Sequence, residues 1–192
     1  MHHIYHTDAF VLASRPTGED SKTLVLYTRE LGLIYARAQA LRKISSKLRF
    51  TLQDFSRALI DLVRGKEIWR VTSATPLDTQ RDILRDPEKE QIVARIYALV
   101  VRMCSGEDPN VEVFGALESL STLLVRSVSP DESRSGELFI VARILISLGY
   151  LDRAALPASD EGIAEIPEHF ADPDYRKNIL MRINAALAAS QL

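Results

Sequence analysis

The chain has 192 residues, 46% of them hydrophobic, which is enough for one large domain or two small domains with separate cores. Its single cysteine, Cys104, excludes an intramolecular disulfide and a zinc site made of four thiolates. No apolar run approaches the roughly 18 residues that cross a membrane, and the first residues lack the apolar core of a signal peptide. We therefore expect a soluble cytoplasmic protein.

The net charge of −2 is the average of two unequal halves. Residues 1–75 hold twelve Lys and Arg against seven Asp and Glu, a net charge of +5, so the remaining residues sum to −7. Such asymmetry suggests that an anionic partner meets the first half and that the second half has another role.

Five stretches rich in Val, Ile, Thr, Leu and aromatic residues indicate strands in the first half. They cover residues 8–14, 23–28, 33–41, 55–63 and 68–73, and segments such as PTGED and RGK separate them. In the third stretch, apolar residues at even positions alternate with Tyr35, Arg37 and Gln39, so one face is apolar and the other can meet a ligand. Five short strands fit a small closed barrel, which leaves no sheet edge exposed.

Five pairs of a capping residue and a proline predict helix starts in the second half. They are Thr75-Pro76, Asp86-Pro87, Asp108-Pro109, Ser129-Pro130 and Asp172-Pro173. Apolar residues repeat at helical spacing in three segments, and the third segment, 138–148, is apolar nearly all round and ends at Gly149. We expect this third helix to be central and residues 156–173 to form a surface connection. The sequence thus predicts a barrel at 1–75 and a helical bundle at 76–192.

A basic segment follows the third predicted strand. Its candidate phosphate-binding residues are Arg42, Lys43, Lys47 and Arg49, with Ser45 and Ser46 between them. Cations attract phosphates without reading bases, and short hydroxyl side chains let the backbone approach. The alternative is a solvated loop whose charges keep the barrel soluble. The positive charge of this half favours phosphate binding.

Other residues of the first half are weaker candidates. Tyr35 and Arg37 could stack on bases, as in many single-strand binders, or could equally pack across to a neighbouring strand. Trp69 alternates with Val71, which favours a core position over a stacking platform. No Gly-rich phosphate loop, acidic metal cluster or nucleophile with a base at recognisable spacing occurs. We therefore expect no catalytic residue, metal or cofactor.

Residues 9–73 resemble the N-terminal domain of RecO, the bacterial recombination mediator. Glu19, Ser21, Thr28 and Gly32 fall on typical positions of that family. The residues that look like its basic loop are Arg42, Lys43, Ser46, Lys47, Leu48 and Arg49. The resemblance continues more thinly into the second half, to the LISLGYL segment that ends at Leu151.

The resemblance implies an α+β multi-domain protein, with a five-stranded OB-fold barrel followed by an all-α helical domain and no catalytic residues. It implies binding of single- and double-stranded DNA, annealing of complementary strands and, with RecR, loading of RecA onto strands coated by single-strand binding protein. Many relatives carry a four-cysteine zinc site that this chain lacks, so zinc is not expected. Gln39 and Ala40 stand where a Lys-Gly pair is usual.

Three functions follow as hypotheses, of which one, a hydrolase acting on nucleic acid, has no carboxylate pair to support it. The first is a nucleoid-associated recombination mediator that contacts DNA through the basic segment, with Arg37 and Tyr35 beside it. The second is a protein-interaction adaptor whose barrel does not bind DNA directly. The acidic helical half is the expected platform for a RecR-like protein and the acidic tail of single-strand binding protein. The acidic domain must gather some of its arginines into a local positive patch or else bind that tail weakly, and the candidates are Arg95, Arg102, Arg126 and Arg143.

Overall fold

The computed structural model describes residues 3–17, 19–39, 47–78, 83–157 and 165–190. The chain divides into two compact units. The barrel unit comprises Met1–Arg81 with Cys104–Pro109, and the helical unit comprises Asp82–Met103 with Asn110–Leu192. Within the described ranges, no helix is long and apolar enough to span a membrane.

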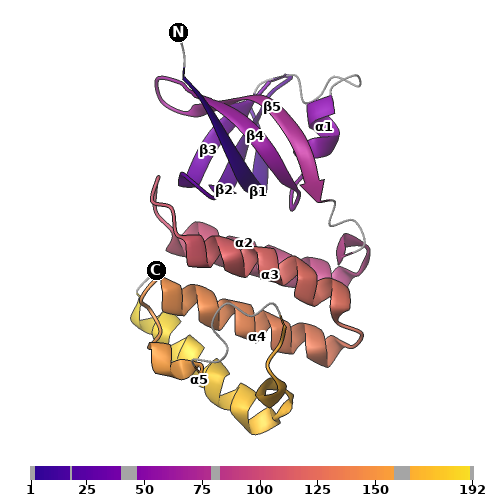
Figure 1. The fold of residues 1–192 in the computed structure, drawn as a ribbon, viewed down its shortest axis with the longest axis vertical. Coiled ribbons are helices and arrows are strands. Elements are labelled where there is room, and N and C mark those ends of the chain that lie inside the picture. The colour runs from indigo at the N-terminus through magenta and orange to yellow at the C-terminus, as the bar shows by residue number, and fades with distance from the viewer. Residues whose placement is uncertain (1–2, 18, 40–46, 79–82, 158–164, 191–192) are drawn as a thin grey trace. The chain divides into compact units, whose positions relative to one another are not determined.

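Five strands form the barrel (Figure 1). They are β1 (Ile4–Pro16), β2 (Lys22–Thr28), β3 (Gly32–Ala38), β4 (Arg57–Arg64) and β5 (Trp69–Asp78). They close in the order β1-β2-β3-β5-β4, and all neighbours are antiparallel except β3 and β5, which are parallel. This closed five-stranded barrel is the OB-fold that the resemblance implied, and with the helices that follow it confirms the α+β class.

The first strand closes the barrel because it pairs on both sides. Residues 4–10 of β1 pair with β4, and residues 9–16 pair with β2. The register with β2 shifts between Val11 and Ala13. Such an irregularity bends a strand and increases its twist, which allows one strand to pass from one neighbour to the other around the barrel.

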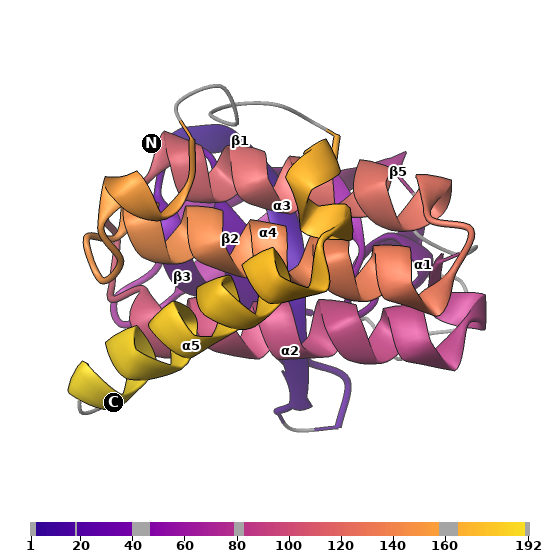
Figure 2. The same cartoon turned by 90° about the horizontal axis from the view of Figure 1, so that it is seen from below.

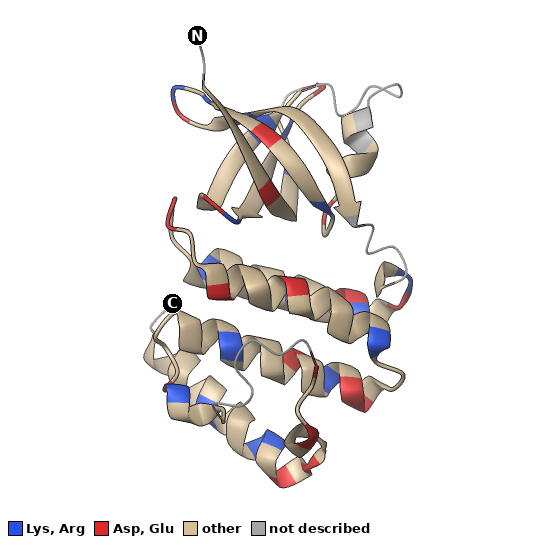
Figure 3. Cartoon of the chain, viewed as in Figure 1, with Lys and Arg blue, Asp and Glu red and all other residues tan. Residues whose placement is uncertain are grey.

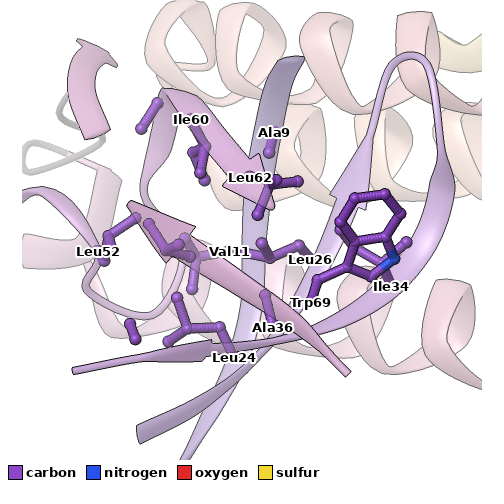
Figure 4. Packing of buried hydrophobic residues seen from close by; sticks show 13 residues of the cluster. Ala9, Val11, Leu24, Leu26, Ile34, Ala36, Leu52, Ile60, Leu62 and Trp69 are labelled. Carbon is purple, nitrogen blue, oxygen red and sulfur yellow. The ribbon is translucent and has the colours of Figure 1, made fainter. Parts of the chain in front are cut away.

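Buried apolar side chains fill the barrel interior (Figure 4). They are Ala9, Val11, Leu24, Leu26, Ile34, Ala36, Ala38, Leu52, Ala58, Ile60, Leu62, Trp69 and Val71. On β3, Tyr35 and Arg37 between these buried positions are exposed, which confirms the predicted alternation. Trp69 is only 4% exposed and Tyr5 packs edge-on against it at 5.0 Å, so its predicted core position is also confirmed.

A short helix, α1 (Lys47–Thr51), lies where the sequence suggested only a basic loop. Leu48 on this helix is half-buried and packs against the barrel core, and Leu52 after it is buried. Strand β4 begins at Arg57 rather than at Phe55 as expected, because Phe55 has a φ of 69° and cannot continue a strand. The backbone N–H of Phe55 donates to the carbonyl of Val11 at 2.8 Å.

Residues 104–109 pack against the barrel at the start of β3. Gly32 has a φ of +70°, a conformation that favours glycine. A Cβ added at Gly32 would lie 2.4 Å from the carbonyl oxygen of Asp108, so the two backbones approach too closely for a side chain. Cys104 is half-buried in the same segment, and burial raises the pKa of its thiol to about 11.

Four long helices form the helical unit (Figure 2). They are α2 (Pro87–Met103), α3 (Val111–Arg126), α4 (Pro130–Ser147) and α5 (Pro173–Ala189). Shorter turns of 3₁₀-helix are η1 (Ile83–Arg85), η2 (Arg153–Ala155) and η4 (Glu168–Ala171). Asp86, Ser129 and Asp172 accept backbone N–H groups at the starts of α2, α4 and α5, which confirms three of the predicted starts.

The other two predicted helix starts are wrong. Thr75 and Pro76 lie within β5, where Pro76 pairs with Ala58 beside a register shift that tolerates the missing N–H. Helix α3 begins after Asn110 rather than after Asp108. The Asn110 side chain accepts the N–H groups of Glu112 and Val113 at 3.0 Å, and so caps the helix.

Helix α4 is central, as predicted, and packs against α2, α3 and α5. Its most buried side chains are Phe139, Ile140, Ala142, Ile144 and Leu145. Gly149 follows its end with a φ of +77°. The connection predicted as a surface segment is not wholly exposed, because Phe170 of η4 is buried against Phe139 with ring centroids 5.4 Å apart.

Candidate nucleic-acid interface

The basic segment predicted from the sequence lies mostly beyond what the structure describes. Arg42, Lys43 and Ser46 are outside the described residues, and Lys47 and Arg49 belong to α1. Their part in phosphate binding therefore stays a prediction. The described strands and turns of the barrel carry further exposed cations, which are Arg37, Lys66 and Arg70.

Tyr35 and Arg37 share the outward face of β3. Tyr35 is 51% exposed, and Arg37 is also exposed. The parallel pairing of β3 with β5 places Arg37 in register with Arg70, which is exposed as well. Two cations that are 33 positions apart in the sequence therefore lie side by side on the barrel surface.

A hollow of about 550 Å³ opens beside this pair. We call it the basic hollow, and its lining residues are Arg37, Arg64, Gly65, Lys66, Glu67, Ile68 and Arg70. Gly65, Lys66, Glu67 and Ile68 form the turn between β4 and β5, where Figure 3 shows both basic and acidic positions. Four cations thus surround the hollow against one carboxylate, which favours an anionic ligand.

The turn takes its shape from Gly65. A Cβ at this position would lie 2.4 Å from the carbonyl oxygen of Ile68, so a larger residue would force the turn open. With glycine the turn stays narrow and brings Lys66 beside the strand ends that carry Arg37 and Arg70.

The cations of the barrel unit differ in whether a carboxylate neutralises them. Arg57 forms a bidentate ion pair with Asp8, in which Nε and Nη2 donate to the two carboxylate oxygens at 3.0 and 2.6 Å. Nη2 of Arg29 lies 3.8 Å from the same carboxylate. Across the part of the chain that the structure describes, Arg37, Lys66 and Arg70 have no carboxylate within ion-pair distance. Their charge is available to a phosphate.

Arg64 is held differently from the other three cations of the hollow. Its guanidinium donates to Glu107 and lies 5.0 Å from the centre of the Trp69 ring. The indole N–H of Trp69 donates to the other oxygen of Glu107 at 3.0 Å. Glu107 therefore neutralises the fourth cation at the edge of the basic hollow.

Sequence reasoning identified Tyr35 and Arg37 but missed Arg64, Lys66 and Arg70 as a group. They contribute to the +5 charge of the first half, but their local sequence indicates only a turn and neighbouring strands. Their proximity to Arg37 depends on the β3–β5 pairing, which no local pattern reveals.

Three of the four arginines expected to form a positive patch on the helical unit already have polar partners within the described residues. Arg95 donates to Glu137 at 2.6 and 2.7 Å, a bond that raises the pKa of Arg95, and Arg126 pairs with Glu165 at 2.6 Å. Arg143 is half-buried, donates to Ser119 at 3.1 Å, and has its pKa lowered by burial.

The chain is similar to known proteins over most of its length. Residues 1–80 match the family described as "Recombination protein O N terminal". A "DNA repair protein RecO" from Pelotomaculum thermopropionicum is 31% identical over 139 residues, 72% of this chain and 54% of that protein. One from Heliobacterium modesticaldum is 31% identical over 153 residues, 80% of this chain and 54% of that protein. The chain spans about half the length of these curated relatives.

Proposed function

The chain belongs to the RecO family, and we propose that it is a DNA-binding mediator of recombinational DNA repair. It binds single- and double-stranded DNA, anneals complementary strands and helps to load recombinase. No chemical step is assigned to it.

The observation that carries this proposal is the charge of the basic hollow. Arg37, Lys66 and Arg70 have no carboxylate within ion-pair distance in the described chain. They line one hollow, with Lys66 in the turn between β4 and β5. OB-folds commonly bind oligonucleotides with the β2–β3 face and the loop between β4 and β5. Phosphate contacts at this turn would hold a strand in place without reading its sequence.

Annealing follows from phosphate neutralisation. Two complementary strands repel each other through their phosphates, and cations that bind the backbone reduce this repulsion. The base edges stay free to pair, so base pairing supplies the driving force. Such a mechanism requires no nucleotide hydrolysis.

The helical unit is the proposed platform for a RecR-like protein and for the tail of single-strand binding protein. Because Arg95 and Arg126 are already paired with acids, an acidic tail would have to compete with Glu137 and Glu165. We therefore propose weak binding of such a tail at these arginines.

A strand-annealing assay tests the proposed function. Complementary strands with a fluorophore and a quencher are mixed with the protein, with and without single-strand binding protein. The wild-type chain is expected to accelerate annealing, and Arg37→Gln/Lys66→Gln/Arg70→Gln to lose most of the acceleration because its phosphate contacts are gone. An adaptor that does not touch DNA would leave the annealing rate the same with either protein.

Changing Glu107 to Gln should raise the affinity for single-stranded DNA. The substitution removes a negative charge and releases Arg64, while the amide oxygen can still accept the Trp69 N–H. One added phosphate contact corresponds to roughly a fivefold gain at about 0.1 M salt. Fluorescence anisotropy with a labelled oligonucleotide measures the gain. Glu90→Gln, which removes the same charge from an exposed position on α2, should change the affinity less than twofold.

A further inference from the structure

Tyr35 differs from the other tyrosines of the barrel unit. Tyr27 is fully buried, and Tyr5 packs against Trp69. Tyr35 is 51% exposed and, as far as the described residues extend, makes no side-chain hydrogen bond and no ring contact. An aromatic ring left open in this way has a face available to a ligand.

The position of Tyr35 relates it to the basic hollow. It lies two residues before Arg37 on the same outward face of β3, so the two Cα atoms are about 6.6 Å apart along the strand. Arg37 is in register with Arg70, and Ile68 beside them also lines the hollow. The aromatic ring of Tyr35 therefore lies next to a candidate phosphate-binding site.

A ring in this place can distinguish the two forms of DNA. Aromatic side chains bind nucleic acids by stacking on the face of a base, which requires that the face is free. In a duplex, neighbouring base pairs cover both faces, and removing a base from the stack costs a few kcal/mol. Phosphates, in contrast, are accessible in single strands and in duplexes alike.

We propose that Tyr35 makes the basic hollow selective for single strands. A base of the single strand stacks on the Tyr35 ring while the adjoining phosphate binds Arg37, Lys66 and Arg70. A duplex uses the phosphate contacts alone. This inference rests on the proposed function, because it assumes that the hollow binds DNA.

The test compares single- and double-stranded probes for two variants of the same residue. In Tyr35→Leu the ring is lost, so the affinity for a labelled oligothymidine should fall roughly tenfold, while the affinity for a duplex of equal length should change less than twofold. In Tyr35→Phe the ring remains, and both affinities should stay within twofold of the wild type. Tyr150→Leu, which removes an exposed tyrosine of the helical unit, serves as the matched control and should have no effect.

The inference is overturned if Tyr35→Leu weakens both probes equally or weakens neither. Circular dichroism of each variant verifies that the barrel is folded, and Tyr35→Thr, which also lacks the ring and suits a strand, replaces the leucine variant if that one does not fold. Failure of the proposed function has a different signature. In that case the wild-type chain binds neither probe, or the variant without Arg37, Lys66 and Arg70 binds both probes as the wild type does.

Discussion

The variant Arg37→Gln/Lys66→Gln/Arg70→Gln is expected to bind single-stranded DNA roughly 100-fold more weakly than the wild type at about 0.1 M salt. The estimate follows from counterion release, in which each phosphate contact on a single strand contributes about 0.7 to the slope of log affinity against log salt. Three such contacts raise the affinity by roughly two orders of magnitude when the salt concentration falls from about 1 M to 0.1 M, and the variant lacks this gain. Titration of a labelled oligonucleotide measures the loss.

The structure provides a matched control for this variant. Arg102, Lys177 and Arg182 lie in the helical unit, and replacing all three by Gln lowers the net charge of the chain by the same amount. This control should keep its DNA affinity within about threefold. Equal losses in the two triple variants would mean that net charge, and not the basic hollow, determines binding.

Folding should be nearly unaffected in the hollow variant. The three side chains are exposed and have no carboxylate partner within the described residues, so their loss removes no ion pair of the folded chain. Surface substitutions of this kind usually change the free energy of unfolding by about 0.5 kcal/mol or less. A loss of DNA affinity can then be assigned to binding and not to unfolding.

Gly32→Ala is expected to lower the free energy of unfolding of the barrel unit by about 2–4 kcal/mol. The new Cβ would lie 2.4 Å from the carbonyl oxygen of Asp108, and the φ of +70° is unfavourable for alanine. The conformational cost is about 1 kcal/mol, and forcing apart two packed backbones adds about 1–3 kcal/mol. Urea denaturation followed by the fluorescence of Trp69, which is the single tryptophan, reports on the barrel.

Gly106→Ala separates the conformational cost of a positive φ from the cost of forcing two backbones apart. Gly106 has a φ of +68°, close to that of Gly32, but a Cβ there would meet no atom within 4 Å. It should therefore show the conformational cost alone, about 1 kcal/mol. If both alanine variants lost the same free energy, the close approach of Asp108 to Gly32 would not be a cause of the destabilisation.

The local patterns of the sequence predicted those features that depend on neighbours along the chain. The alternation around Ala36 predicted which residues of β3 face the core, and the Ser129-Pro130 pair predicted the start of α4. The prediction of a helix start at Thr75-Pro76 was wrong because a capping residue followed by a proline also occurs near the end of a strand.

The candidate site could be predicted only in part, for a topological reason. Tyr35 and Arg37 were visible as polar positions on an alternating strand, because that pattern is local. Lys66 and Arg70 join them only through the parallel pairing of β3 with β5, which depends on how the barrel closes. Glu107 comes from beyond α2, so its bond to Trp69 depends on the packing of a segment far along the chain.

If Arg37, Lys66 and Arg70 bind DNA phosphates, these contacts must appear in the salt dependence of DNA binding. Affinities for an oligothymidine are measured between about 0.05 and 0.3 M salt for the wild type and for the variant with all three cations changed to Gln. We expect the slope of log affinity against log salt to be shallower by about 2 in the variant, since three phosphate contacts are lost. Parallel lines for the two proteins would contradict phosphate binding by these cations.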